Sequence, residues 1–261
     1  MRVNKTKAKL QRGEMALGAS VGFDSPDTVE LLGALGFDYV SFDLEHEVFD
    51  ERAIQHAIRA AENFDITPIL RVPKDPDLIL RLLDAGAQGI HVPQINTVED
   101  AKRVIDACRF HPQGNRTFYA VARSGNYGIG LTEEEYAETS NRETLVILQV
   151  EELEGVKNLA EILAVPYYDA IQVGPKDLWQ SMGMPDRAKV WEVVDDVIVK
   201  AVQAGRWASM YAWITTDMDE QVAHYRRLGV NLVTISARDL LVLGTHAYLK
   251  PWQQVNASSR G

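Results

Sequence analysis

Short apolar runs alternate with segments of helical periodicity along most of this chain. The runs are rich in β-branched and aromatic side chains, as buried strands are. Eight strands with helices between them predict a parallel (β/α)8 TIM barrel, because a right-handed parallel sheet of this kind closes at eight strands. The predicted strands are 16–21, 39–43, 68–72, 89–92, 145–150, 169–173, 208–212 and 232–235, and the predicted helices are 26–35, 50–63, 75–83, 97–108, 155–163, 189–204 and 218–228.

The same junction joins a helix to the next strand at three places. A helix rich in leucine ends, glycine follows and an apolar strand begins, around Gly36, Gly86 and Gly229. Glycine readily takes the left-handed conformation in which many helices end. The recurrence therefore indicates repeated helix-to-strand units.

Three segments lie outside the repeated units. Residues 1–14 are a polar lead-in that we expect to form a short helix. Residues 110–142 have no barrel period, and excursions of this length usually form lids or interfaces. Residues 239–252 form an apolar helix with Pro251 near its end, which we expect to cap the barrel or to exchange with a neighbouring subunit. Residues 1–261 are predicted to form a single barrel domain.

Composition narrows the class of protein. The chain has 261 residues, of which 46% are hydrophobic, close to the roughly 250 residues of a typical α/β barrel. A net charge of −10 argues against binding to nucleic acid or an anionic membrane. Cys108 is the one cysteine, so no intrachain disulfide is expected. No secretory signal and no transmembrane segment are predicted, so we expect a cytoplasmic protein.

Polar residues gather where the predicted strands end. In a barrel enzyme the chemistry takes place at the carboxyl ends of the strands, so these side chains should converge on one rim. They are Asp43, Glu45 and His46 after the second strand, Arg71 at the third, Gln149 and Glu151 at the fifth, Gly174, Pro175, Lys176 and Asp177 after the sixth, and Arg238 after the eighth.

Glu151 and Asp177 follow adjacent strands and are candidate ligands of a hard divalent cation. Magnesium or manganese takes one or two protein carboxylates and fills its octahedron with water and substrate oxygens. The alternative is that each is a solvated loop acid.

His46 and Arg71 are the candidate catalytic side chains. His46 is a possible general base with Asp43 orienting its ring, or else a histidine held by a loop carbonyl. Arg71 suits a carboxylate or a developing oxyanion, and it can also pair with Asp43 or Glu45. A Schiff-base mechanism would need a desolvated lysine at a strand end, for which Lys176 is the candidate.

Taken together, these motifs resemble those of the HpcH/HpaI class II pyruvate aldolases, which include 4-hydroxy-2-oxoheptanedioate aldolase. The resemblance covers nearly the whole chain. It rests on Gly36-Phe37-Asp38, Asp43-x-Glu45-His46, Arg71, Leu82-Leu83-Asp84-x-Gly86, Val92-Pro93, Gln149-Val150-Glu151 and Gly174-Pro175-x-Asp177-Leu178.

The resemblance implies a metal-dependent barrel lyase that joins pyruvate and an aldehyde through the pyruvate enolate. It implies that Glu151 and Asp177 hold magnesium, manganese or cobalt, that His46 and Asp43 move protons, and that Arg71 steadies pyruvate. Gln149 and the backbone around Gly174-Pro175-Lys176 would bind the substrate. Asp84 would reach a neighbour's site in a hexamer of swapped dimers.

Two departures affect the expected aldehyde site. Family members often carry Gly-Val-Gly after the arginine of the excursion, where this chain has Thr117-Phe118-Tyr119 after Arg116, and Lys176 stands where a small residue is common. Acceptor specificity is therefore the least transferable property.

Four other readings stay open. A decarboxylating relative such as macrophomate synthase and a lyase acting on coenzyme A thioesters are the first two. A phosphate-binding isomerase would want glycine-rich turns where this chain has Trp213-Ile214-Thr215-Thr216 and Ser236-Ala237-Arg238. A catalytically silent assembly barrel is the fourth.

Overall fold

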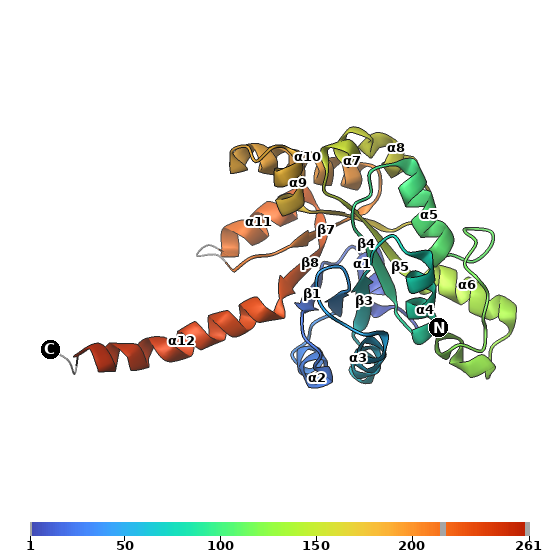
Figure 1. Cartoon of the computed structure of the whole chain (residues 1–261), viewed down its shortest axis with the longest axis horizontal. Coiled ribbons are helices and arrows are strands. Elements are labelled where there is room, and N and C mark those ends of the chain that lie inside the picture. Colours follow the sequence, from blue (N-terminus) through green and yellow to red (C-terminus); the bar gives the residue numbers. More distant parts are fainter. Residues whose placement is uncertain (1, 215–217, 259–261) are drawn as a thin grey trace.

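Eight parallel strands close into one barrel in the computed structural model, which describes residues 2–214 and 218–258 (Figure 1). Each strand pairs with its neighbours in sequence, and β8 pairs with β1, so the predicted (β/α)8 fold is confirmed. Thr215 and Thr216 of the predicted turn lie outside the described residues. The strands are β1 (Ala16–Val21), β2 (Tyr39–Asp43), β3 (Thr67–Arg71), β4 (Gly89–Val92), β5 (Leu145–Val150), β6 (Ala170–Val173), β7 (Trp207–Tyr211) and β8 (Val230–Ser236).

Helices between the strands cover the outside of the barrel, and α1 precedes β1 (Figure 1). They are α1 (Lys5–Gln11), α2 (Pro26–Ala34), α3 (Glu51–Asn63), α4 (Pro76–Ala85), α5 (Val98–Cys108), the 3-10 helix η1 (Arg123–Gly128), α6 (Glu133–Glu143), α7 (Leu153–Lys157), α8 (Leu159–Ala164), α9 (Pro175–Ser181), α10 (Arg187–Gln203), α11 (Met218–Leu228) and α12 (Ala237–Ser258). Among the described residues, none of these helices is both long and apolar enough to cross a bilayer.

Local sequence signals explain where several helices begin and end. The side chains of Ser25 and Thr97 each accept a hydrogen bond from a backbone amide in the first turn of α2 and α5. Gly36, Gly86 and Gly229 all have φ between +81° and +110°, which confirms the three predicted helix-to-strand junctions.

Four helical segments differ from the expectations. Part of the excursion 110–142 forms η1 and α6, and α6 lacks an apolar stripe because Tyr136 is its only buried hydrophobic residue. The helix expected over 155–163 is divided into α7 and α8 at Asn158. A short helix, α9, begins directly after β6, and α12 continues through Pro251 to residue 258.

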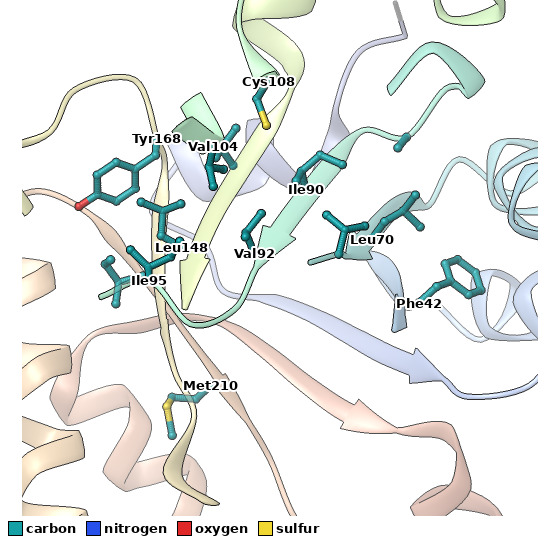
Figure 2. Close-up of a cluster of buried hydrophobic side chains, with 14 of the residues drawn as sticks. Phe42, Leu70, Ile90, Val92, Ile95, Val104, Cys108, Leu148, Tyr168 and Met210 are labelled. Atoms are coloured by element: carbon teal, nitrogen blue, oxygen red, sulfur yellow. The ribbon is translucent and has the colours of Figure 1, made fainter. Parts of the chain in front are cut away.

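Alternation along the strands produces two separate apolar layers. Side chains such as Phe42, Leu70, Ile90 and Leu148 point outward and pack between the barrel and the helices (Figure 2). A second cluster fills the amino-terminal half of the barrel interior, and Leu10 of α1 joins it as a plug. Its other buried members are Ala16, Tyr39, Ile69, Leu145, Ile147, Ala170 and Leu232. The carboxyl half of the interior is therefore left for polar side chains.

The helix α12 does not fold back over the barrel. It extends away from it along the long axis of the molecule (Figure 1). Leu241, Tyr248 and Trp252 are at least 60% exposed on it. Near its base an apolar cavity of about 240 Å³ lies open between β1, β8 and α11, and its lining includes Leu17 and Val222. The capping alternative for this helix is therefore wrong for the single chain.

Replacing Gly86 with alanine is expected to destabilise the fold. Gly86 has φ +110°, and a Cβ there would lie 2.5 Å from Nη1 of Arg123. We expect Gly86→Ala to lower the free energy of unfolding by about 1–3 kcal/mol in urea titrations. Gly244→Ala is the control, because a Cβ at this helical position meets no atom within 4 Å. Equal stability of the Gly86→Ala protein and wild type would contradict this reading of the junction.

Candidate active site

Asp43, Arg71 and His91 stand side by side at the carboxyl rim because their strands are in register. Asp43 pairs with Arg71 across β2 and β3, and Arg71 pairs with His91 across β3 and β4. All three continue the inward-facing alternation of their strands, so they end in the polar half of the barrel interior. The register thus brings together residues that are far apart in sequence.

Arg71 forms a two-point ion pair with Asp43. Its Nε donates to Oδ1 of Asp43 at 2.9 Å, and its Nη2 donates to Oδ2. Burial acts to raise the pKa of Asp43, but the guanidinium and two backbone amides outweigh it and hold the pKa below its ordinary value. The pair predicted as an alternative for Arg71 therefore exists, and Glu45 lies 3.8 Å from the same Nε.

His46 does not contact Asp43 through its ring. Asp43 instead accepts hydrogen bonds from the backbone amides of Glu45 and His46, at 3.0 and 3.3 Å. The nearest carboxylate to the imidazole is Glu45, 3.5 Å from Nε2, and the His46 side chain is 62% exposed. The structure thus differs from the expected Asp43–His46 pair, because Asp43 is already engaged by Arg71. A role of His46 in proton transfer stays a prediction.

Glu151 is a buried carboxylate without a cationic partner among the described residues. It is 3% exposed and accepts hydrogen bonds from the side chain of Gln149 and from the backbone amide of Gln94, the latter at 2.9 Å. Burial raises its pKa to about 7, and the nearby carboxylates of Asp177 and Glu45 add to the rise. Two hydrogen bonds leave much of the cost of this buried charge uncompensated.

Asp177 reaches the same rim from the first turn of α9. Gly174, immediately before α9, keeps the space between the two segments open, since a Cβ there would lie 2.4 Å from Oε2 of Glu151. The buried Oε1 of Gln149 has no hydrogen-bond partner in the described structure. Glu151 and Asp177 therefore offer carboxylate oxygens, which suit a hard divalent cation.

The described residues contain no cluster of three or more His, Cys, Asp or Glu side chains placed to hold a metal. Two carboxylates match the coordination of magnesium, which keeps several waters and takes few protein ligands. The predicted metal pair fits this pattern, and its role stays a prediction.

A cavity of about 430 Å³ opens beside these groups, although neither Glu151 nor Glu45 lines it. Asp43, His46 and Arg71 line one side, and Gly174, Lys176 and Asp177 line the other, with Gln149 also at the wall. Lys176 is exposed, whereas a Schiff-base lysine needs a desolvated setting. The cavity thus collects most of the predicted site residues.

Asp84 lies away from this cavity, near the carboxyl end of α4. Its Oδ1 accepts a hydrogen bond from Nη2 of Arg116 at 2.6 Å. Helices and strands of the barrel run in opposite directions, so this end of α4 is at the opposite end of the barrel from the rim. Asp84 therefore takes no part in the site of its own chain, and its reach to a neighbouring subunit stays a prediction.

Sequence reasoning missed three residues of this site. His91 is buried between Arg71 and Gln149, and burial together with Arg71 lowers its pKa to about 3, so it is neutral at pH 7. Gln94, with φ +58°, also donates from its side chain to Glu45 at 3.0 Å. Tyr211 ends β7 and lines the cavity near Ser20. The inward period of β4 and β7 was the only signal for His91 and Tyr211.

The fold and the rim carboxylates define a (β/α)8-barrel enzyme site, and comparison with known proteins specifies the family. The model of the HpcH/HpaI aldolase/citrate lyase family matches residues 20–239. The chain therefore belongs to this family, and it is a carbon–carbon lyase of the aldolase type.

Individual relatives agree with this assignment. A hydroxypyruvate/pyruvate aldolase of Roseobacter denitrificans is 32% identical over 97% of this chain and 98% of its own. A 2-dehydro-3,6-dideoxy-6-sulfogluconate aldolase of Pseudomonas putida is 34% identical over 75% of this chain and 77% of its own. The crystal structure of a family member from Burkholderia cenocepacia superposes with a TM-score of 0.84 at 29% identity, over 96% of this chain and 100% of that one.

The buried Glu151 predicts an unusual dependence of stability on pH. An unfolded glutamate loses its proton near pH 4.3, whereas folded Glu151 keeps it until about pH 7. Between these values the unfolded state binds fewer protons, so the stability of the metal-free protein falls as pH rises. We expect Glu151→Gln to remove up to about 3 kcal/mol of this decline between pH 4.5 and 7.5.

The free energy of unfolding is measured by urea titration across this pH range for metal-free wild type, Glu151→Gln and Glu154→Gln. Glu154 is an exposed carboxylate on α7, so its variant should follow wild type. Parallel curves for all three proteins would show that Glu151 is not held protonated by its surroundings.

Proposed function

We propose that this chain is a divalent-metal-dependent pyruvate aldolase, which cleaves 4-hydroxy-2-oxo acids to pyruvate and an aldehyde and catalyses the reverse addition. Glu151 is the observation that carries the proposal. Its carboxylate is 3% exposed, has the carboxylates of Asp177 and Glu45 as neighbours, and pairs with no lysine or arginine in the described structure. A buried carboxylate with further negative charge nearby is stabilised by a bound cation.

Glu151 and Asp177 would hold magnesium, manganese or cobalt. Such a cation, when bound, withdraws electrons from the keto group of a 2-oxo acid and favours its enolate, an effect worth several kcal/mol.

Arg71 would bind pyruvate and steady the charge that develops on its keto oxygen. Asp43 fixes the guanidinium by two contacts, which leaves Nη1 available for the substrate. Backbone amides at the start of α9 and the side chain of Gln149 complete the pyruvate site. Neutral His91 lies beside Arg71 and Gln149. It contacts Gln149 and adds no second positive charge next to Arg71.

His46 would transfer protons at the mouth of the site. Its ring is 62% exposed and lies 3.5 Å from Glu45, so it can exchange protons with solvent while a carboxylate supports the imidazolium. General acid–base catalysis of this kind contributes roughly 10²–10⁴-fold to a rate. In the addition direction, carbon 3 of pyruvate first loses a proton and then attacks the aldehyde carbon, and the aldehyde oxygen takes up a proton to become the hydroxyl group.

The apolar α12 supports the proposed assembly into swapped dimers and a hexamer. Leu241, Tyr248 and Trp252 are exposed along it. The apolar cavity beside Leu17 and Val222 lies between β8 and β1, where the helix that follows the last strand of a barrel would pack. We propose that α12 of a second copy covers this side. The buried apolar area would stabilise both chains.

Exchange of the pyruvate methyl protons in deuterated buffer tests the activity without any aldehyde. We expect exchange with magnesium or manganese and none after chelation, measured by proton NMR. Arg71→Ala should lower the exchange rate by about 10²–10³-fold because a charge-stabilising donor is lost. Glu151→Ala should first weaken the apparent affinity for the metal.

Arg81→Ala is the control for Arg71→Ala, because Arg81 forms an exposed ion pair with Glu51 outside the cavity. A fully active Arg71→Ala protein would contradict the assignment of Arg71 to the active site. Exchange that survives chelation would point to Lys176, and absence of exchange in wild type would remove the proposed function.

The size of the assembly tests the role of α12. We expect Tyr248→Glu to shift the protein to smaller species in size-exclusion chromatography with light scattering, because it places a charge in an apolar contact. His246→Glu lies on the other side of the same helix and should leave the size unchanged. A wild-type monomer, or an unaltered Tyr248→Glu oligomer, would argue against the exchange of α12.

A further inference from the structure

The candidate active-site cavity continues past the proposed pyruvate and metal residues toward the ends of β6, β7 and β8. This part, which we call the β6–β8 side, is lined by Lys176, Trp213, Ser236 and Arg238. None of these side chains is needed to bind pyruvate or the cation. An acceptor that approaches pyruvate from this side would have them as its surroundings.

Lys176 brings a positive charge to the β6–β8 side without a counter-ion. It follows β6 directly, its side chain is exposed, and it has no ion pair or hydrogen bond within the described part of the chain. A solvated lysine at a cavity wall can meet an anionic ligand without first breaking an internal contact.

Arg238 brings a second positive charge from the other flank. It stands at the start of α12, and its side chain is 77% exposed. Nε and Nη2 both point at one oxygen of Asp239, at 3.4 and 3.5 Å, the long end of the hydrogen-bond range. Arg238 therefore keeps donors for a ligand, and a planar guanidinium suits carboxylate, sulfonate and phosphate alike.

The barrel order brings the two cations together. β6 and β8 are both neighbours of β7, so the strand ends that precede Lys176 and Arg238 are two strand spacings apart, about 10 Å. Both side chains are long enough to reach a common group across that distance. Trp213 lies between them on the β7 segment and packs edge-on against Trp191, with ring centroids 5.7 Å apart. This contact holds the Trp213 ring in place at the lining of the cavity.

The acids around the cavity do not cancel both charges. Asp43 is engaged by Arg71, Asp177 is the proposed metal ligand, and Glu47 lies across the cavity near Gly22. Asp239 remains for Arg238, and Lys176 stays unmatched. The β6–β8 side therefore carries an excess of positive charge in a protein whose net charge is −10.

We propose that Lys176 and Arg238 bind an anionic group at the far end of the acceptor, so that the enzyme prefers aldehydes that carry a carboxylate, sulfonate or phosphate. This inference rests on the proposed aldolase function. The anionic group is held and does not react. Carbon 3 of pyruvate still gives up one proton and forms the new bond to the aldehyde carbon, and the aldehyde oxygen takes up one proton.

Steady-state addition to pyruvate tests the preference. The acceptors are four-carbon aldehydes with a terminal carboxylate, its methyl ester, a terminal sulfonate, a terminal phosphate or a terminal hydroxyl. We expect kcat/KM to be at least about tenfold higher for one or more of the anionic aldehydes than for the ester and the alcohol. The order of kcat/KM among the carboxylate, sulfonate and phosphate aldehydes shows which of these anionic groups the enzyme prefers.

Arg238→Gln and Lys176→Met should each reduce the ratio of anionic to neutral kcat/KM by about tenfold, mainly through KM, because one charged hydrogen bond is lost. Raising the salt concentration should reduce the wild-type ratio in the same direction, since the contacts are exposed and screened. Arg226→Gln on α11 and Lys189→Met on α10 are the matched controls, because they remove the same charges outside the cavity and should leave the ratio unchanged.

Pyruvate proton exchange is measured on each protein to separate the two proposals. Retained exchange with equal kcat/KM for anionic and neutral aldehydes would overturn the anionic acceptor alone. An unchanged ratio in both Arg238→Gln and Lys176→Met would do the same. Loss of exchange in wild type would overturn the aldolase function and this inference with it.

Discussion

The buried carboxylate of Glu151 is the constraint on which the catalytic half of this molecule depends. A negative charge at 3% exposure, beside further carboxylates, is costly unless a cation or a proton neutralises it. The surrounding structure is adapted to this demand: Gly174 leaves room for the carboxylate, and Gln94 and Gln149 donate hydrogen bonds to it. The protein therefore maintains a strained electrostatic site at the rim, while its core supplies stability elsewhere.

The barrel separates these two tasks along its axis. Apolar side chains and the plug residue Leu10 fill the amino-terminal half of the interior, and the outer cluster seals strands against helices (Figure 2). The candidate active-site groups lie in the carboxyl half, where Asp43 and Arg71 neutralise each other. A rigid lower half can hold these rim groups in place, which is what preorganised electrostatic catalysis requires.

The region around β8 is where substrate recognition and assembly meet. Ser236 and Arg238 line the cavity where β8 passes into α12, and α12 then leaves the barrel. If a second copy binds this helix, the start of α12 is fixed by that contact as well. The cations proposed to select the acceptor and the helix proposed to join the subunits are thus parts of one continuous segment.

The sequence by itself determined the strands, most helix starts, the three glycine junctions and the list of rim residues, because these depend on local periodicity, capping and backbone conformation. Only the tertiary structure decided which rim groups touch. The register of β2 with β3 directs Asp43 to Arg71 and leaves His46 beside Glu45, and the pairing of β4 with β5 places His91 near Gln149. The direction of α12 also came only from the structure, because an apolar helix has the same sequence pattern whether it covers its own barrel or another chain.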